Sequence, residues 1–70
     1  MSSVKWSDAD EIGFLLSEKF PDTDPLAVRF TDLRAWVTQL DGFSDDPAAS
    51  NERILETIQM AWLGYYKDTH

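Results

Sequence analysis

The sequence predicts a small, mainly α-helical domain built from three helices. Three separate segments carry apolar residues at the three- and four-residue spacing that places them on one face of a helix. The connectors between these segments are short, and residues 28–30 have the pattern of extended chain. Together these observations indicate an all-α arrangement of the helix-turn-helix class, with at most a very short β pairing.

The length and composition fit one domain whose stability comes from an apolar core. The chain has 70 residues, of which 43% are hydrophobic, and it contains no cysteine. Disulfide bonds and thiolate metal sites are therefore excluded as supports of the fold. We expect a single domain over residues 1–70, with a core spanning about residues 4–66.

The first helix is expected to begin at about residue 8 and to end at Phe20-Pro21. Ser7, followed by an acid three residues later, has the pattern of an N-terminal capping box. The apolar stripe of this helix contains Ala9, Ile12, Gly13, Leu16 and Phe20. Glu11, Phe14 and Glu18 project from the other side. One side of the helix is thus predicted to be core and the other acidic.

Turn signals and a second apolar stripe define the middle of the chain. Asp24 is placed to cap a brief helical turn that Pro25 opens. Thr31 is predicted to cap a second helix, which ends near Gly42 in an Asp-Gly turn. The residues on the apolar face of this helix are Leu33, Trp36, Val37 and Leu40.

The third helix carries the longest apolar stripe of the chain. Either Ser50 or Asp46 is expected to cap it, because both residue types accept hydrogen bonds from a helix N-terminus. Fraying is expected from Tyr65 onward. Ahead of all three helices, residues 4–6 are expected to pair either with residues 28–30 or with Phe43. The apolar face of the third helix comprises Ile54, Leu55, Ile58, Ala61, Trp62 and Tyr65.

Charge restricts the function more than any single motif does. Thirteen acidic side chains against six basic ones give a net charge of −7 at pH 7. Such a domain repels phosphate backbones and anionic lipids, so its natural partners are basic protein surfaces and hard cations. No segment approaches the roughly 20 apolar residues that span a bilayer, and we expect a soluble, cytoplasmic protein.

The chain offers little from which a catalytic centre could be built. A general acid, base or nucleophile needs a water-poor site, and the only histidine is the terminal His70. The acidic second and third helices also argue against a DNA-reading helix, which needs exposed Arg and Lys. We therefore expect a protein that is not an enzyme and does not bind nucleic acid.

Carboxylates at helical spacing are candidate ligands for a metal ion. Glu11 and Glu18 share a helix face with Asp8 nearby, and Asp45-Asp46 form a second acidic pair. Oxygen ligands suit hard divalent cations, including iron, and the lack of any EF-hand pattern predicts weak affinity. The alternative is that Glu11 and Glu18 are solvated surface residues, while Asp8 and Asp10 stabilise the N-terminus of the first helix and Asp46 caps the third.

Aromatic and basic residues outside the apolar stripes are candidate partner contacts. Trp6 is either a hydrophobic staple of the first helix or a partly exposed interface anchor. Phe14 is either an exposed anchor or packed under a loop. Arg29 and Arg34 either pair with nearby acids or contact a partner.

The succession of residues along the chain resembles the IscX family, also called YfhJ, of small acidic proteins in bacterial iron-sulfur cluster assembly. The resemblance spans about residues 4–63, which is nearly the whole domain. The shared residues are Lys5-Trp6-Ser7-Asp8, Glu11-Ile12-Gly13, Pro21-Asp22, Asp24-Pro25, residues 28–33, Trp36, Leu40, Phe43, Asp45-Asp46-Pro47, residues 49–52 and 54–56, and Trp62-Leu63.

The resemblance implies a modified winged-helix-like fold, weak Fe(II) binding on an acidic surface, and docking onto the cysteine desulfurase that supplies sulfur. It also implies competition with bacterial frataxin, or its modulation, at that desulfurase. The negative charge agrees with such a partner, because complementary fields raise encounter rates. The candidate metal ligands are Asp8, Glu11, Glu18, Asp45 and Asp46. The candidate partner contacts are Trp6, Asp8, Glu11, Phe14, Glu18, Arg29, Asp32 and Arg34.

Two positions depart from the family's pattern. Arg34 stands where members often carry histidine, and Ser44 stands where they often carry an acid. Docking onto the desulfurase is less affected by these changes than iron binding is. We expect a monomeric, non-catalytic accessory protein that docks through one acidic side and carries Fe(II) loosely as a donor or modulator. The alternative is a generic acidic adaptor or nucleic-acid mimic that occupies another basic surface.

Overall fold

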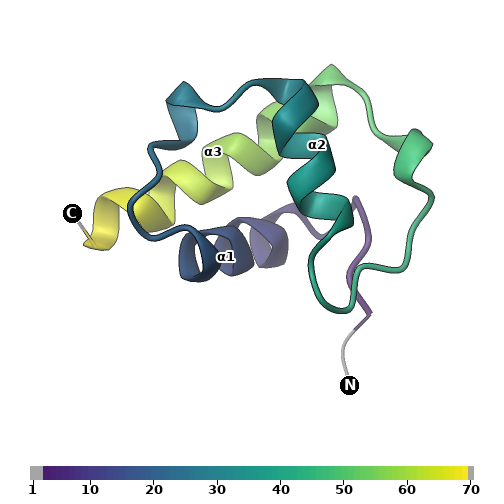
Figure 1. Cartoon of the computed structure of the whole chain (residues 1–70), viewed down its shortest axis with the longest axis horizontal. Helices are drawn as coiled ribbons and strands as arrows, with labels where there is room; N and C mark the ends of the chain where they lie inside the picture. Colours follow the sequence, from purple (N-terminus) through teal and green to yellow (C-terminus); the bar gives the residue numbers. More distant parts are fainter. Residues whose placement is uncertain (1–2, 70) are drawn as a thin grey trace.

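Three α-helices form the domain, and the prediction of a mainly α-helical fold is confirmed. The computed structural model describes residues 3–69. Within this range, no helix combines the length and apolar character needed to cross a membrane. The helices are α1 (Ala9–Lys19), α2 (Phe30–Thr38) and α3 (Glu52–Thr69), and the 3-10 turns are η1 (Pro25–Ala27) and η2 (Pro47–Ala49) (Figure 1).

The longest helix, α3, is the element on which the other helices pack. Its contact with α1 is the most extensive in the domain, and α2 and η1 pack on the other side of α3 in the view of Figure 1. The predicted apolar stripes supply the buried face of each helix. The buried core residues are Val4, Trp6, Ile12, Leu16, Leu33, Val37, Leu40, Leu55, Ile58 and Trp62.

The only strand-like pairing within residues 3–69 is an isolated parallel bridge between Val4 and Phe43. The Val4 N–H donates to the Gly42 carbonyl at 2.8 Å, and the Ser44 N–H donates to the Val4 carbonyl at 2.9 Å. The predicted pairing with Phe43 is therefore confirmed, and the alternative with residues 28–30 is wrong. The winged-helix-like arrangement stays a prediction.

Helix α1 begins after Asp8 and not after Ser7, so the predicted capping box is wrong. Asp8 is the N-cap, and its side chain makes no capping hydrogen bond to the helix. Its Oδ2 instead accepts from the Lys5 N–H at 3.0 Å, while the Asp8 N–H donates to the Lys5 carbonyl at 2.9 Å. This reciprocal turn uses the carboxylate that would otherwise cap the helix.

Helices α2 and α3 also begin at other residues than the sequence predicts. Arg29, in an extended conformation, is the N-cap of α2, and Thr31 lies inside the helix. At the start of α3, the Asn51 Oδ1 accepts from the Ile54 N–H at 2.9 Å, so Asn51 and not Ser50 is the capping residue.

Both Asp-Pro pairs open short helical turns, as predicted for Asp24-Pro25. The Asp24 Oδ1 accepts from the Leu26 N–H at 3.0 Å, and the Asp46 Oδ1 accepts from the Ala48 N–H at 2.9 Å. Asp46 therefore caps η2 and not α3. These caps satisfy backbone donors that have no partner within such short turns.

The C-terminal end of α3 remains helical further than expected. The helix continues to Thr69, whereas the sequence predicts fraying from Tyr65. Tyr65 packs against Phe14 of α1, and this contact stabilises the segment that was expected to loosen. His70 lies outside the described residues.

Gly13 lies where α1 packs directly against α3. A Cβ atom at this position would lie 2.7 Å from the Trp62 backbone N and 2.8 Å from the Ala61 Cβ. Both distances are far shorter than van der Waals contact, so a side chain here would push the helices apart. The glycine is unfavourable for helix formation, but it lets the two helices pack directly against each other.

Trp6 joins the N-terminal segment to the connector between α2 and α3, and we name this contact the N-terminal latch. Its side chain is 3% exposed and packs edge-to-face on Phe43, with ring centroids 5.1 Å apart. The Trp6 N–H donates to Asp45 Oδ2 at 3.1 Å, and its Nε1–H donates to the Asp46 carbonyl at 2.7 Å. Trp6 is therefore a core residue and not a partly exposed anchor.

Replacing Gly13 with Ala should destabilise the domain by about 1–3 kcal/mol, because the added methyl overlaps α3. Gly64 is the matched control, since a Cβ there meets nothing within 4 Å. Gly64→Ala should stabilise α3 by about 0.5–1 kcal/mol. Urea unfolding followed by circular dichroism measures both. Equal changes in the two variants would contradict the role assigned to Gly13.

Asp45 should make the stability of the N-terminal latch depend on pH. Hydrogen bonds from the Trp6 and Asp46 backbone N–H groups hold the pKa of Asp45 below its ordinary value of 3.8. Such a carboxyl stabilises the fold above pH 3.8 and loses this contribution as the pH falls through its folded pKa. Asp45→Asn should therefore lower the Tm at pH 7, and the difference should shrink in acid. A difference that stays constant down to complete acid protonation would show that the latch does not depend on this charge.

Candidate functional site

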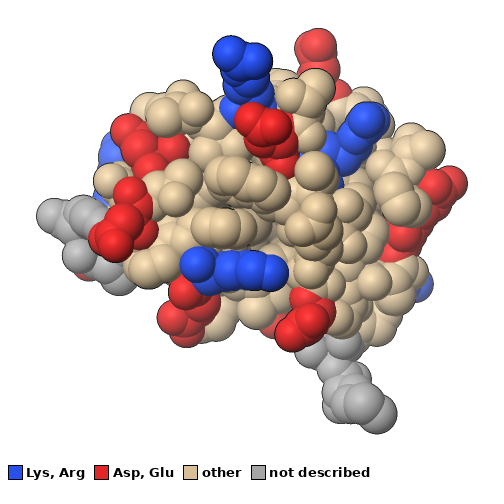
Figure 2. All heavy atoms as spheres, viewed as in Figure 1, with Lys and Arg blue, Asp and Glu red and all other residues tan. Residues whose placement is uncertain are grey.

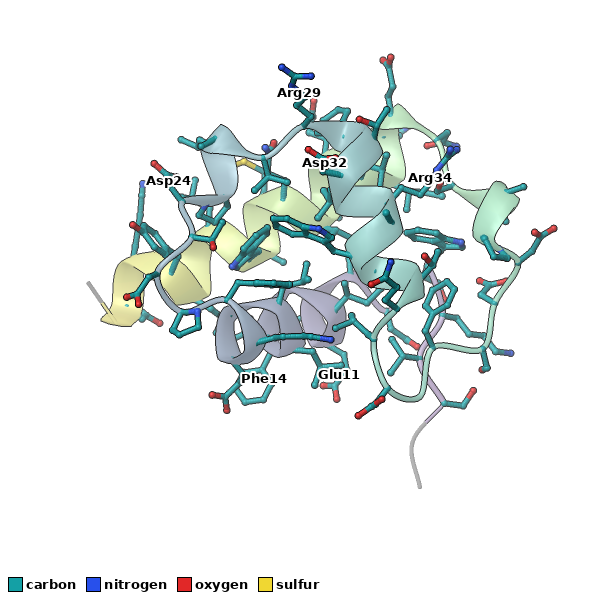
Figure 3. All side chains as sticks on the ribbon, in the orientation of Figure 1. Glu11, Phe14, Asp24, Arg29, Asp32 and Arg34 are labelled. Atoms are coloured by element: carbon teal, nitrogen blue, oxygen red, sulfur yellow. The ribbon has the colours of Figure 1, made fainter. Side chains whose placement is uncertain are left out.

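Six of the eight residues predicted to contact a partner lie at two separate edges of the domain, whereas Trp6 is buried and Asp8 precedes α1. Glu11 and Phe14 project from α1 at one edge, whereas Arg29, Asp32 and Arg34 lie at α2, across the molecule (Figure 3). All five side chains are exposed. We define the α2 edge as Arg29, Asp32 and Arg34. We define the α1 edge as Asp10, Glu11, Phe14 and Glu18.

The two edges differ in local charge. Three of the four residues of the α1 edge are carboxylates. At the α2 edge two guanidinium groups accompany the single Asp32 carboxylate, and within residues 3–68 neither Arg29 nor Arg34 has an acid within 4.0 Å. The alternative in which these arginines pair with nearby acids is therefore not realised. Of the two sets of residues, that of the α1 edge offers a basic surface the more favourable charge.

Acidic side chains lie at several edges of the molecule and not on one side. Figure 2 shows them around the outline of the domain, with a largely uncharged area between them. The expectation of a single acidic side is therefore wrong. The reason is local: acids such as Asp24 and Asp46 cap helical turns in the connectors, outside α1.

The five predicted metal ligands do not converge. Among the residues that the structure describes, no three His, Cys, Asp or Glu side chains are grouped to hold a metal ion. Asp8, Asp45 and Asp46 accept backbone hydrogen bonds. Glu11 and Glu18 are two helical turns apart, about 10 Å along the axis. These carboxylates do not form a prearranged iron site, and weak Fe(II) binding stays a prediction.

A groove between α1 and the C-terminal half of α3 adjoins the α1 edge. Phe14 is 41% exposed and packs edge-to-face on Tyr65, with ring centroids 5.5 Å apart. Phe14 is thus on the surface and not under a loop. The groove is lined by Phe14, Ser17, Glu18, Pro21, Asp22, Tyr65 and Asp68. A neighbouring hollow shares Tyr65 and Asp68 with this groove. It is lined by Asp10, Met60, Ala61, Gly64, Tyr65 and Asp68. We name the two together the α1/α3 groove.

The Tyr65 hydroxyl lies in the negative field of this groove. It donates a hydrogen bond to Asp10 Oδ2 at 3.1 Å. That bond raises the pKa of Tyr65 above its ordinary value of 10.0, and partial burial and the charges of Asp10, Glu11 and Asp68 raise it further. No Lys or Arg of the described chain lines the groove. Its carboxylates therefore share the groove with no basic side chain of the described residues.

Reasoning from the sequence did not identify this groove. Tyr65 is predicted as part of the buried stripe of α3, but its ring is half-buried and its hydroxyl reaches Asp10 of α1. Asp68 follows Tyr65 by three positions, a spacing that places both on one helix face. That spacing is a signal in the sequence, whereas the nearness of Asp10 depends on how the helices pack.

Comparison with known proteins agrees with the resemblance seen in the residues. The model of the family described as "Iron-sulphur cluster assembly" matches residues 4–67. The chain is also similar to an uncharacterized protein, PA3808, of Pseudomonas aeruginosa. The two are 52% identical over 61 residues, which cover 87% of this chain and 92% of that protein. The matched range includes α1 and most of α3. The chain therefore belongs to the iron-sulphur cluster assembly family known as IscX or YfhJ, a family of accessory proteins and not a known family of enzymes.

Proposed function

We propose that this protein is a non-catalytic accessory factor of iron-sulfur cluster assembly that docks onto the cysteine desulfurase through its α1 edge. Membership of the family supports a role in iron-sulfur cluster assembly. One observation carries the choice of surface: Asp10, Glu11 and Glu18 lie exposed around Phe14, an aromatic residue that is itself 41% exposed. A basic enzyme surface would find both charge complementarity and apolar contact at this edge.

The physical basis of this docking is attraction at long range followed by short contacts. A domain of net charge −7 is drawn toward a basic surface, which raises the association rate. At contact, carboxylates and Lys or Arg side chains form charge-assisted hydrogen bonds. The Debye length falls from about 30 Å at 0.01 M salt to about 8 Å at 0.15 M. Affinity for the desulfurase should therefore fall as salt is added.

Competition with frataxin follows from the same proposal. If frataxin uses the same basic surface, as the resemblance to the family implies, the two proteins exclude each other by overlap. The desulfurase would then hold one of them at a time, in proportion to concentration and affinity. In this account the protein regulates assembly by occupying the surface.

Reversing one charge at each edge tests the proposal. Glu11→Lys and Asp32→Lys each change the net charge from −7 to −5, and they lie on opposite edges. Glu11→Lys should weaken binding to the desulfurase at least about tenfold at low salt, since it places a like charge at the contact. Asp32→Lys should change the affinity less than about twofold. Isothermal titration calorimetry measures both.

The competing proposal is a generic acidic adaptor or nucleic-acid mimic, and it is favoured by the acids at several edges in Figure 2. Binding of that kind depends on total charge and not on one edge. Equal weakening by the two variants would support it and contradict docking through α1. A desulfurase that does not bind the wild-type protein would overturn the proposed function itself.

A further inference from the structure

We infer that the α1/α3 groove receives an arginine side chain presented by the basic partner. The inference rests on the proposed docking of a basic surface at the α1 edge, and it names the chemical group that the site takes. The groove combines two features that a guanidinium group uses together, an aromatic wall and carboxylates around it.

The aromatic wall is formed by one ring from each of two helices. Phe14 of α1 and Tyr65 of α3 meet edge-to-face at an interplanar angle of 71°. Part of the Phe14 ring is exposed, and the Tyr65 hydroxyl is fixed by its hydrogen bond to Asp10. The direct packing at Gly13 holds the two helices together beside this pair. The wall is thus in place before a partner binds, which reduces the entropic cost of binding.

The charges around the wall favour a cation. Asp10, Glu18, Asp22 and Asp68 line the groove, and no Lys or Arg of the described chain does. Met60, which is 56% exposed, adds an apolar part to the lining. An apolar ligand would leave the carboxylates without partners, and a bare metal cation would make no use of the rings.

Arginine fits this combination better than lysine does. The guanidinium is planar, stacks on aromatic faces and donates two parallel hydrogen bonds to one carboxylate. The lysine ammonium is a compact, strongly hydrated charge without a planar face. A groove with carboxylates alone would bind arginine and lysine equally well. A preference for arginine is therefore the specific consequence of the aromatic wall.

Titration of the isotope-labelled full chain with acetyl-Leu-Arg-Leu-amide, followed by NMR, tests the inference. The ring signals of Phe14 and Tyr65 and the amide of Asp68 should shift, while the amide of Asp32 should not. A peptide with citrulline in place of arginine has nearly the same shape but no charge, and should give less than about a third of these shifts. The lysine peptide should give intermediate shifts. Silent ring signals, or equal shifts with arginine and citrulline, would overturn the inference.

Single-residue variants distinguish the contribution of the aromatic wall to peptide binding from that of negative charge in general. Phe14→Leu keeps apolar bulk on the surface and removes the ring, so it should weaken binding of the arginine peptide about threefold. Asp68→Asn should weaken it about twofold. Asp32→Asn is the matched control, because it removes one exposed carboxylate at the α2 edge, across the molecule. Equal effects of Asp68→Asn and Asp32→Asn, or none for Phe14→Leu, would contradict an arginine site in the groove.

The same variants measured against the desulfurase distinguish the two proposals. Weaker binding of Phe14→Leu and Asp68→Asn, with Asp32→Asn unchanged, is the expected result. If the desulfurase binds all variants like the wild type, the groove is not the contact, although the proposed function stands. If the desulfurase binds none of the proteins while the arginine peptide still shifts the ring signals, the proposed partner is wrong and the arginine site stands.

Discussion

The direct contact between α1 and α3 at Gly13 is the constraint on which the remaining structure depends. A single added Cβ atom would lie within 2.8 Å of α3 atoms, so only glycine permits this spacing. The spacing buries Ile12 and Leu16. It also brings Asp10 within hydrogen-bond distance of Tyr65, 55 positions further along the chain. One residue without a side chain thus determines both the core and the surface on either side of the helix pair.

Local charge, and not total charge, distinguishes the surfaces of this domain. A net charge of −7 favours the approach of any basic surface. It does not determine which edge makes the contact, because acids also cap the helical turns in the connectors. The choice follows from where the cations lie. Arg29 and Arg34 lie exposed at the α2 edge, whereas no Lys or Arg of the described residues lines the α1/α3 groove. In the proposed docking, this difference favours one orientation of the domain on a basic partner.

The sequence predicted what depends on periodicity and on neighbouring residues, and missed what depends on packing. The stripe containing Ile12 and Leu16 and the turn at Asp24-Pro25 follow from local rules, and both are confirmed. The cap at Ser7 is wrong because capping rules do not tell which of two adjacent polar residues the chain uses, and the Asp8 carboxylate turns back to Lys5. The α1/α3 groove was missed because it joins residues of two helices whose relative placement no spacing rule gives.

The most direct test of the account is chemical-shift mapping of the labelled protein on addition of unlabelled desulfurase. Because docking is assigned to the helix pair joined at Gly13, the signals of Glu11, Phe14 and Tyr65 should shift or broaden first. Those of Arg29 and Asp32 should remain unchanged at the same stoichiometry. Changes confined to the α2 edge, with the α1 edge silent, would contradict the account.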